Sequence, residues 1–224
     1  MIASRTLLAA ALATGILVPA TAEAAVIPGL FNTGVDANGA ALVGGDGLID
    51  PHYLIVASTS PGYAGQQATT YTHPNYWPND ADSRWVSLSG TGGPGENVTI
   101  YRLSFSLSGL DPATAQIAGA YAADNLARVY LNGLDTGWVT DAFQALRSFS
   151  LTSGFVSGVN TLDFQVTDGA APGALRVDSL MGVADVLSPP AGIPEPATWA
   201  MMLIGFFGMG GVLRGRRLWA STVA

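Results

Sequence analysis

The middle of the chain alternates apolar and polar residues with a period of two, in short stretches. Tyr101, Leu103, Phe105 and Leu107 alternate with polar residues, and residues 161–167 repeat the pattern. Successive side chains of a β-strand point to opposite faces, so this pattern predicts strands with one buried face. No stretch of the middle region keeps a helical apolar stripe for three turns. We therefore expect an all-β fold before the C-terminal tail.

Shorter stretches predict further strands, and turns rich in glycine, asparagine and aspartate separate them. The additional strands are expected at residues 53–57, 84–88, 115–122, 128–131, 149–152 and 175–177. The turns are expected at residues 44–47, 132–133, 135–137 and 168–169. Many short strands joined by such turns are typical of an antiparallel β-sandwich. We expect one such domain, over residues 25–186.

The N-terminus has the pattern of a secretory signal peptide, expected over residues 1–24. Arg5 precedes an apolar stretch at residues 7–18, and small residues between Ala22 and Ala25 offer several cleavage positions. The apolar stretch is too short to span a bilayer, so cleavage is favoured over an uncleaved anchor helix. The domain that follows is therefore expected to be exported.

A second apolar stretch, residues 197–213, follows a proline-rich linker at residues 187–193. It contains no charge and lies at the short limit for a helix that crosses a bilayer. It stops at Arg214, Arg216 and Arg217, which the positive-inside rule places in the cytoplasm. The pattern predicts one C-terminal transmembrane helix, and an ordinary permanent tail anchor is the alternative to a removable one.

The start of this tail, Pro194-Glu195-Pro196-Ala197-Thr198-Trp199-Ala200, resembles the PEP-CTERM protein-sorting signal in its Trp-Ala variant. The resemblance covers residues 194–217, whereas residues 218–224 extend past the usual end of such tails. It implies an inner-membrane anchor that an exosortase-type membrane peptidase removes near the Pro-Glu-Pro box. It also implies a cell-surface or extracellular protein that accompanies exopolysaccharide. The residues that carry the resemblance are Pro194, Glu195, Pro196, Trp199, Ala200, Arg214, Arg216 and Arg217.

Three segments of the middle region follow one another in a recognisable order. They are RVYLNG at residues 128–133, FSLT at residues 149–152 and GVNTLDF at residues 158–164. This order resembles the galactose-binding-like jelly roll of glycosidase accessory domains and carbohydrate-binding modules. The resemblance implies the fold more than a function, because the repeated residues have structural roles.

Those structural roles follow from the backbone conformations that small and polar residues allow. Asn132 and Gly133 are expected to supply the positive φ angles of a tight hairpin. Gly158 and Asn160 are expected to turn the chain into the next strand with left-handed backbone.

Composition excludes several classes of function. Between residues 25 and 193 the chain has five arginines against fourteen acids, and it has no lysine anywhere. Such a charge does not favour nucleic acid as a partner. Cysteine is absent, which excludes disulfides and thiolate metal sites. Only two histidines, His52 and His73, are present, too few for a histidine-rich metal site.

Catalytic motifs are weak. No Gly-x-Ser-x-Gly motif occurs, and the glycine-rich segment at residues 90–95 precedes a β pattern where a dinucleotide-binding loop would open a helix. We expect a non-enzymatic protein associated with exopolysaccharide. The alternative is a secreted hydrolase acting on glycans or peptides, whose paired carboxylates the sequence alone does not reveal.

Aromatic residues gather in a loop rich in proline and asparagine, and they are the candidate ligand contacts. Aromatic faces suit pyranose rings, because apolar C–H groups pack on them while hydroxyls reach asparagine and aspartate. Trp77 is either a sugar platform or an anchor of its loop, while the rival Trp85 is expected in the core and Trp138 is a second rival. The candidates are Tyr71, His73, Tyr76 and Trp77.

Carboxylates in the same loop suggest a metal. Asp80 and Asp82, beside Asn79, offer oxygen ligands at a spacing that calcium accepts. Aspartate and asparagine also build turns without any metal, and this interpretation is favoured. No cofactor is otherwise expected.

Overall fold

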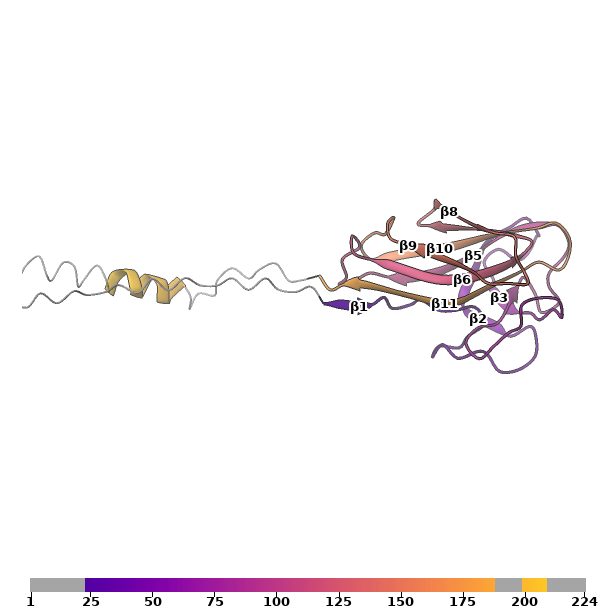
Figure 1. The fold of residues 1–224 in the computed structure, drawn as a ribbon, viewed down its shortest axis with the longest axis horizontal. Coiled ribbons are helices and arrows are strands. Elements are labelled where there is room, and N and C mark those ends of the chain that lie inside the picture. Colours follow the sequence, from indigo (N-terminus) through magenta and orange to yellow (C-terminus); the bar gives the residue numbers. More distant parts are fainter. Residues whose placement is uncertain (1–22, 188–198, 209–224) are drawn as a thin grey trace, which may run out of the picture. The chain divides into compact units, whose positions relative to one another are not determined.

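A computed structural model describes residues 23–187 and 199–208 (Figure 1). The chain divides into two compact units at Val186, and we call residues 23–186 the sandwich domain. Its strands are β1 (Ala24–Val26), β2 (Ile49–Ser58), β3 (Gln67–Thr70), β4 (Val86–Ser87), β5 (Asn97–Ser106), β6 (Gln116–Asp124), β7 (Leu126–Leu131), β8 (Leu134–Thr140), β9 (Arg147–Leu151), β10 (Val159–Asp168) and β11 (Ala174–Asp185).

The strands form one hydrogen-bonded path in the order β8-β7-β10-β5-β2-β3-β4-β11-β6-β9. Every pairing along this path is antiparallel. The short strand β1 pairs with the end of β11 and lies beside it in Figure 1. The expected all-β antiparallel architecture is therefore confirmed.

The core lies between two layers of this path. The ring of Phe164 in β10 contacts Tyr121 of β6 at a centroid distance of 5.9 Å and Phe149 of β9 at 6.1 Å. Strands from opposite ends of the path therefore face each other across the core, as in a β-sandwich. The alternation in β5 has its predicted effect, because Leu103 and Phe105 are buried on the inner face.

The sequence pattern located most strands, with three omissions. Strands β1, β3 and β8 were not predicted, and β11 is longer than the expected residues 175–177. The turn expected at residues 135–137 was wrong, since these residues lie inside β8. Gly137 has a φ of 79°, and its N–H donates to Asp135 Oδ1 at 2.8 Å. These residues have the backbone angle and the hydrogen bond of a turn, but they form a bulge within a strand.

The hairpin expected at Asn132 and Gly133 is confirmed by their φ angles of 53° and 79°. Gly158 also has the expected positive φ, at 78°. The left-handed backbone expected at Asn160 was wrong, because Asn160 is a buried residue of β10. Its side chain accepts from Val156 N–H at 2.9 Å and donates to Val156 O at 2.7 Å. Asn160 therefore holds the preceding loop through its side chain.

The tail is described only in part. Residues 199–208 are helical, and their side chains are exposed. Within the described residues, no helix is long and apolar enough to cross a membrane. Residues 1–22 of the predicted signal peptide lie outside the described residues, as do the Pro-Glu-Pro box and the arginine cluster at residues 214–217. The last residue of the predicted signal peptide, Ala24, belongs to β1 of the sandwich domain.

Candidate functional site

The aromatic candidates lie in the loop between β3 and β4, and the structure separates them by burial. Tyr71 and Tyr76 are buried, and they form a small second core with Trp85. The rings of Tyr76 and Trp85 are 4.6 Å apart, so the core position expected for Trp85 is confirmed. His73 is half-buried, whereas Trp77 is 43% exposed. Trp77 is thus the one exposed residue among the four predicted aromatic contacts.

The hydroxyl of Tyr76 ties this loop to the sandwich. It donates to Asp124 Oδ2 at 2.6 Å, at the end of β6, and lies 2.7 Å from Pro172 O. Burial, and next the hydrogen bond to Asp124, raise the pKa of Tyr76 well above its ordinary value. The phenol therefore stays protonated and acts as an anchor of the loop.

The main chain of Trp77 is held on both sides. Its N–H donates to Phe143 O at 2.8 Å, and its carbonyl oxygen accepts the indole N–H of Trp85 at 2.7 Å. The next carbonyl oxygen, that of Pro78, accepts from Arg176. The exposed indole of Trp77 is therefore carried by a fixed backbone.

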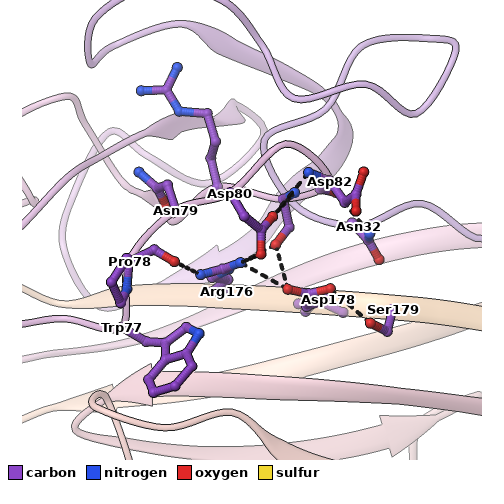
Figure 2. Close-up of polar contacts among 12 residues, drawn as sticks. Asn32, Trp77, Pro78, Asn79, Asp80, Asp82, Arg176, Asp178 and Ser179 are labelled. Atoms are coloured by element: carbon purple, nitrogen blue, oxygen red, sulfur yellow. Dashed lines mark hydrogen bonds and ion pairs between the residues drawn. The ribbon is translucent and has the colours of Figure 1, made fainter.

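Arg176 of β11 is fully buried, and Figure 2 shows its polar contacts with the loop. Its Nε donates to Ser83 Oγ at 2.8 Å, and its Nη2 donates to Asp80 Oδ2 at 2.5 Å and Asp178 Oδ2 at 2.8 Å. A guanidinium keeps its charge and offers several donors in one plane, so a single side chain can satisfy carboxylates and a main-chain carbonyl together. Arg176 thereby fixes the loop between β3 and β4, which we call the Trp77 loop, to the sheet.

Asp80 has a structural role in this network. Its Oδ1 accepts from the N–H groups of Asp82 and Ser83 at 3.0 and 2.9 Å. Partial burial raises the pKa of Asp80, but the Asp82 N–H and the Arg176 charge outweigh it, so the net pKa is lowered. The exposed carboxylate of Asp82 lies beside it. Within the described ranges no three acids or histidines cluster as a metal site would need, and calcium binding by Asp80 and Asp82 stays an untested alternative to their role in a turn.

Sequence reasoning missed the residues that support the loop. Arg176 lies 98 positions from Pro78, and Phe143 comes from the segment between β8 and β9. One signal was present, since Arg176 is an arginine between Leu175 and Val177 in a short apolar run. A charged residue in such a run indicates either an outward side chain or a buried, paired one.

Comparison with known proteins does not assign a family. No family model matches the chain, and no curated protein matches it.

Among solved structures, a Stig cyclase from Fischerella sp. TAU is 11% identical with a TM-score of 0.42, covering 74% of this chain and 100% of that one. CBM35 from Paenibacillus barcinonensis is 14% identical with a TM-score of 0.32, covering 65% and 100%. The CBM36-1 domain of a xylanase from the hindgut metagenome of Trinervitermes trinervoides is 9% identical with a TM-score of 0.30, covering 77% and 100%. With TM-scores this low, these similarities define no function for the chain.

Proposed function

We propose that this chain is an exported, non-enzymatic protein of the cell envelope or extracellular matrix that binds exopolysaccharide through Trp77. The observation that carries the proposal is an indole that is 43% exposed on a backbone fixed by Phe143, Trp85 and Arg176. An aromatic face packs against the C–H groups of a pyranose ring. A contact surface that is already ordered loses little conformational entropy on binding.

The proposed route to the cell surface rests on the sequence. Residues 1–24 direct export, and residues 194–217 act as a PEP-CTERM sorting signal with a transmembrane helix at residues 197–213. The body between them is a galactose-binding-like jelly roll. Its antiparallel sandwich architecture supports that assignment, and the exposed apolar side chains of the helix at residues 199–208 suit a membrane segment.

Mass spectrometry of the mature C-terminus tests the sorting step. In cells with the exosortase-type peptidase, the chain is expected to end near Pro194 to Pro196, and in cells without it the chain keeps its tail. An intact tail in both strains would instead show a permanent anchor.

Glycan binding is tested on the sandwich domain alone, because every core residue in the part of the chain that the structure describes lies between Ile27 and Ala184. The domain is incubated with the producing cells' purified polysaccharide, and the bound fraction is measured after sedimentation. Trp77→Ala is expected to lower retention about tenfold or more, as for an aromatic hot spot, while Trp77→Phe keeps part of it. The melting temperature should be nearly unchanged in both variants.

Two results would overturn this function. A domain that does not bind, but hydrolyses glycosides in a reaction abolished by an Asp→Asn substitution, would be a hydrolase. A large stability loss in Trp77→Ala would show that the indole anchors its loop and is not a platform.

A further inference from the structure

A groove lies between strands β8 and β9, which are the two ends of the sheet path. It has a volume of about 310 Å³, at the lower end of the range for small-molecule sites, about 300–1,000 Å³. The side chain of Trp138 lines it and is 37% exposed. The polar lining residues are Asp135, Thr136, Ser150, Thr152 and Ser153.

A bulge in β8 places Trp138 at this groove. Arg128 pairs with Val139 and Tyr130 pairs with Asp135, so the residues of β8 around Trp138 lie opposite a single residue of β7. Such a bulge interrupts the alternation of a strand and redirects a side chain. The indole N–H of Trp138 then donates across to Ser150 O in β9 at 2.9 Å. The Trp138 ring is thereby held at the groove by a cross-strand bond.

The chemistry of the lining selects a class of ligand. Ser150, Thr152 and Ser153 are exposed, and each hydroxyl both donates and accepts hydrogen bonds. Asp135 is the single charged residue of the lining, and no basic residue belongs to it. An aromatic ring beside several hydroxyls and one carboxylate suits a neutral sugar. An acidic sugar would meet the Asp135 carboxylate, whereas Arg128, which pairs with Asp135 at 3.9 Å, does not line the groove.

We propose that this groove is a second carbohydrate site, which takes a neutral sugar unit against Trp138. The ligand class of this site rests on the proposed function, but the site is built from residues outside the Trp77 loop. Two separate sites on one domain would let it hold two segments of polysaccharide, and the second contact would be effectively intramolecular.

Indole NMR signals test the two sites separately. The sandwich domain contains three tryptophans, Trp77, Trp85 and Trp138, whose N–H signals are assigned with single Trp→Phe variants. The probes are oligosaccharides released by partial acid hydrolysis of the producing cells' polysaccharide, separated by anion exchange into neutral and acidic pools. The neutral pool is expected to shift the Trp138 signal in a saturable way. The indole N–H of buried Trp85 bonds to the Trp77 carbonyl oxygen, so its signal is the internal control for binding at Trp138 only.

Each outcome decides one claim. A shift of the Trp77 signal alone supports the proposed function and overturns the second site. A shift of the Trp138 signal alone supports the groove site and overturns glycan binding through Trp77. A response at Trp138 only to the acidic pool overturns the neutral-sugar assignment. As a matched check, Thr152→Val leaves the bond from the Trp138 indole N–H to Ser150 O in place. It should weaken the sugar-induced shift of the Trp138 signal at least threefold, with the shift of the Trp77 signal unchanged.

Discussion

The buried indole N–H of Trp85 donates to the main-chain carbonyl oxygen of Trp77 at 2.7 Å. Trp85 is 1% exposed and Trp77 is 43% exposed, so a core tryptophan fixes a surface one. The bond links folding to the proposed function, because the position of the exposed indole depends on packing beneath it.

Trp85→Phe is expected to destabilise the sandwich domain by about 1–3 kcal/mol beyond the lost packing, because the Trp77 carbonyl loses its donor in a poorly hydrated place. Urea unfolding measures this change. Trp138→Phe is the matched control, since its partner Ser150 belongs to an exposed edge position where water can replace the indole N–H. Equal losses in the two variants would contradict the anchoring role of Trp85.

Arg176→Met is expected to lower the free energy of unfolding by about 3–5 kcal/mol, because it leaves the Asp178 carboxylate buried without its cation. Arg128→Met is the control. Arg128 faces Asp135 at 3.9 Å in an exposed pair, for which about 0–1 kcal/mol is typical. Urea unfolding at neutral pH compares the two. A small effect at Arg176 would mean that the loop is held mainly by its aromatic packing.

Asp168 makes the free energy of unfolding of the sandwich domain depend on pH. It is 1% exposed, and its Oδ2 has no hydrogen-bond partner within the described part of the chain. Burial above all, with a contribution from the Asp124 charge, raises its pKa above the ordinary 3.8. The folded state therefore holds this proton more tightly than the unfolded chain does. The associated stability is fully present below pH 3.8 and is lost as the pH rises through the folded pKa.

Asp168→Asn is accordingly expected to stabilise the domain at pH 7, with an advantage that shrinks as the pH falls toward 3.8. Urea unfolding at several pH values measures the difference, and Asp141→Asn on the exposed surface is the control. A variant that is less stable than the wild type by the same amount at every pH would rule out a charged, poorly solvated Asp168.

Removal of calcium is expected to leave the melting temperature unchanged. The Oδ2 of Asp80 is already occupied by Arg176 at 2.5 Å, and its Oδ1 accepts two N–H groups. The check is thermal unfolding of the sandwich domain in excess chelator and in millimolar calcium. A melting temperature that rises with calcium concentration would indicate a bound ion, since a ligand of the folded state stabilises it by mass action.

Local patterns predicted the strands, and distant contacts decided the site. The alternation in residues 101–107 and 161–167 is a property of each strand alone, so β5 and β10 were predicted from sequence. Strands β1 and β3 are too short to show a period. In β8 the residues of the bulge at Gly137 have the composition of a turn, so a turn was predicted where the strand lies.

The site was less predictable, because burial of a loop residue depends on what covers it. Tyr71 and Tyr76 are buried by contacts with Ala122 and Ala174, which lie on β6 and β11. Arg176, far away in sequence, fixes the backbone next to Trp77 through the Pro78 carbonyl oxygen. Aromatic clustering predicted where the candidate site lies, and the tertiary fold determined which ring faces solvent.

The most direct test of the account is affinity electrophoresis of the sandwich domain through gels that contain the producing cells' polysaccharide. The wild-type domain should be retarded in proportion to the polysaccharide concentration, and Trp77→Ala should be retarded much less at the same stability. Equal mobility of the two proteins at every concentration would contradict glycan binding by Trp77.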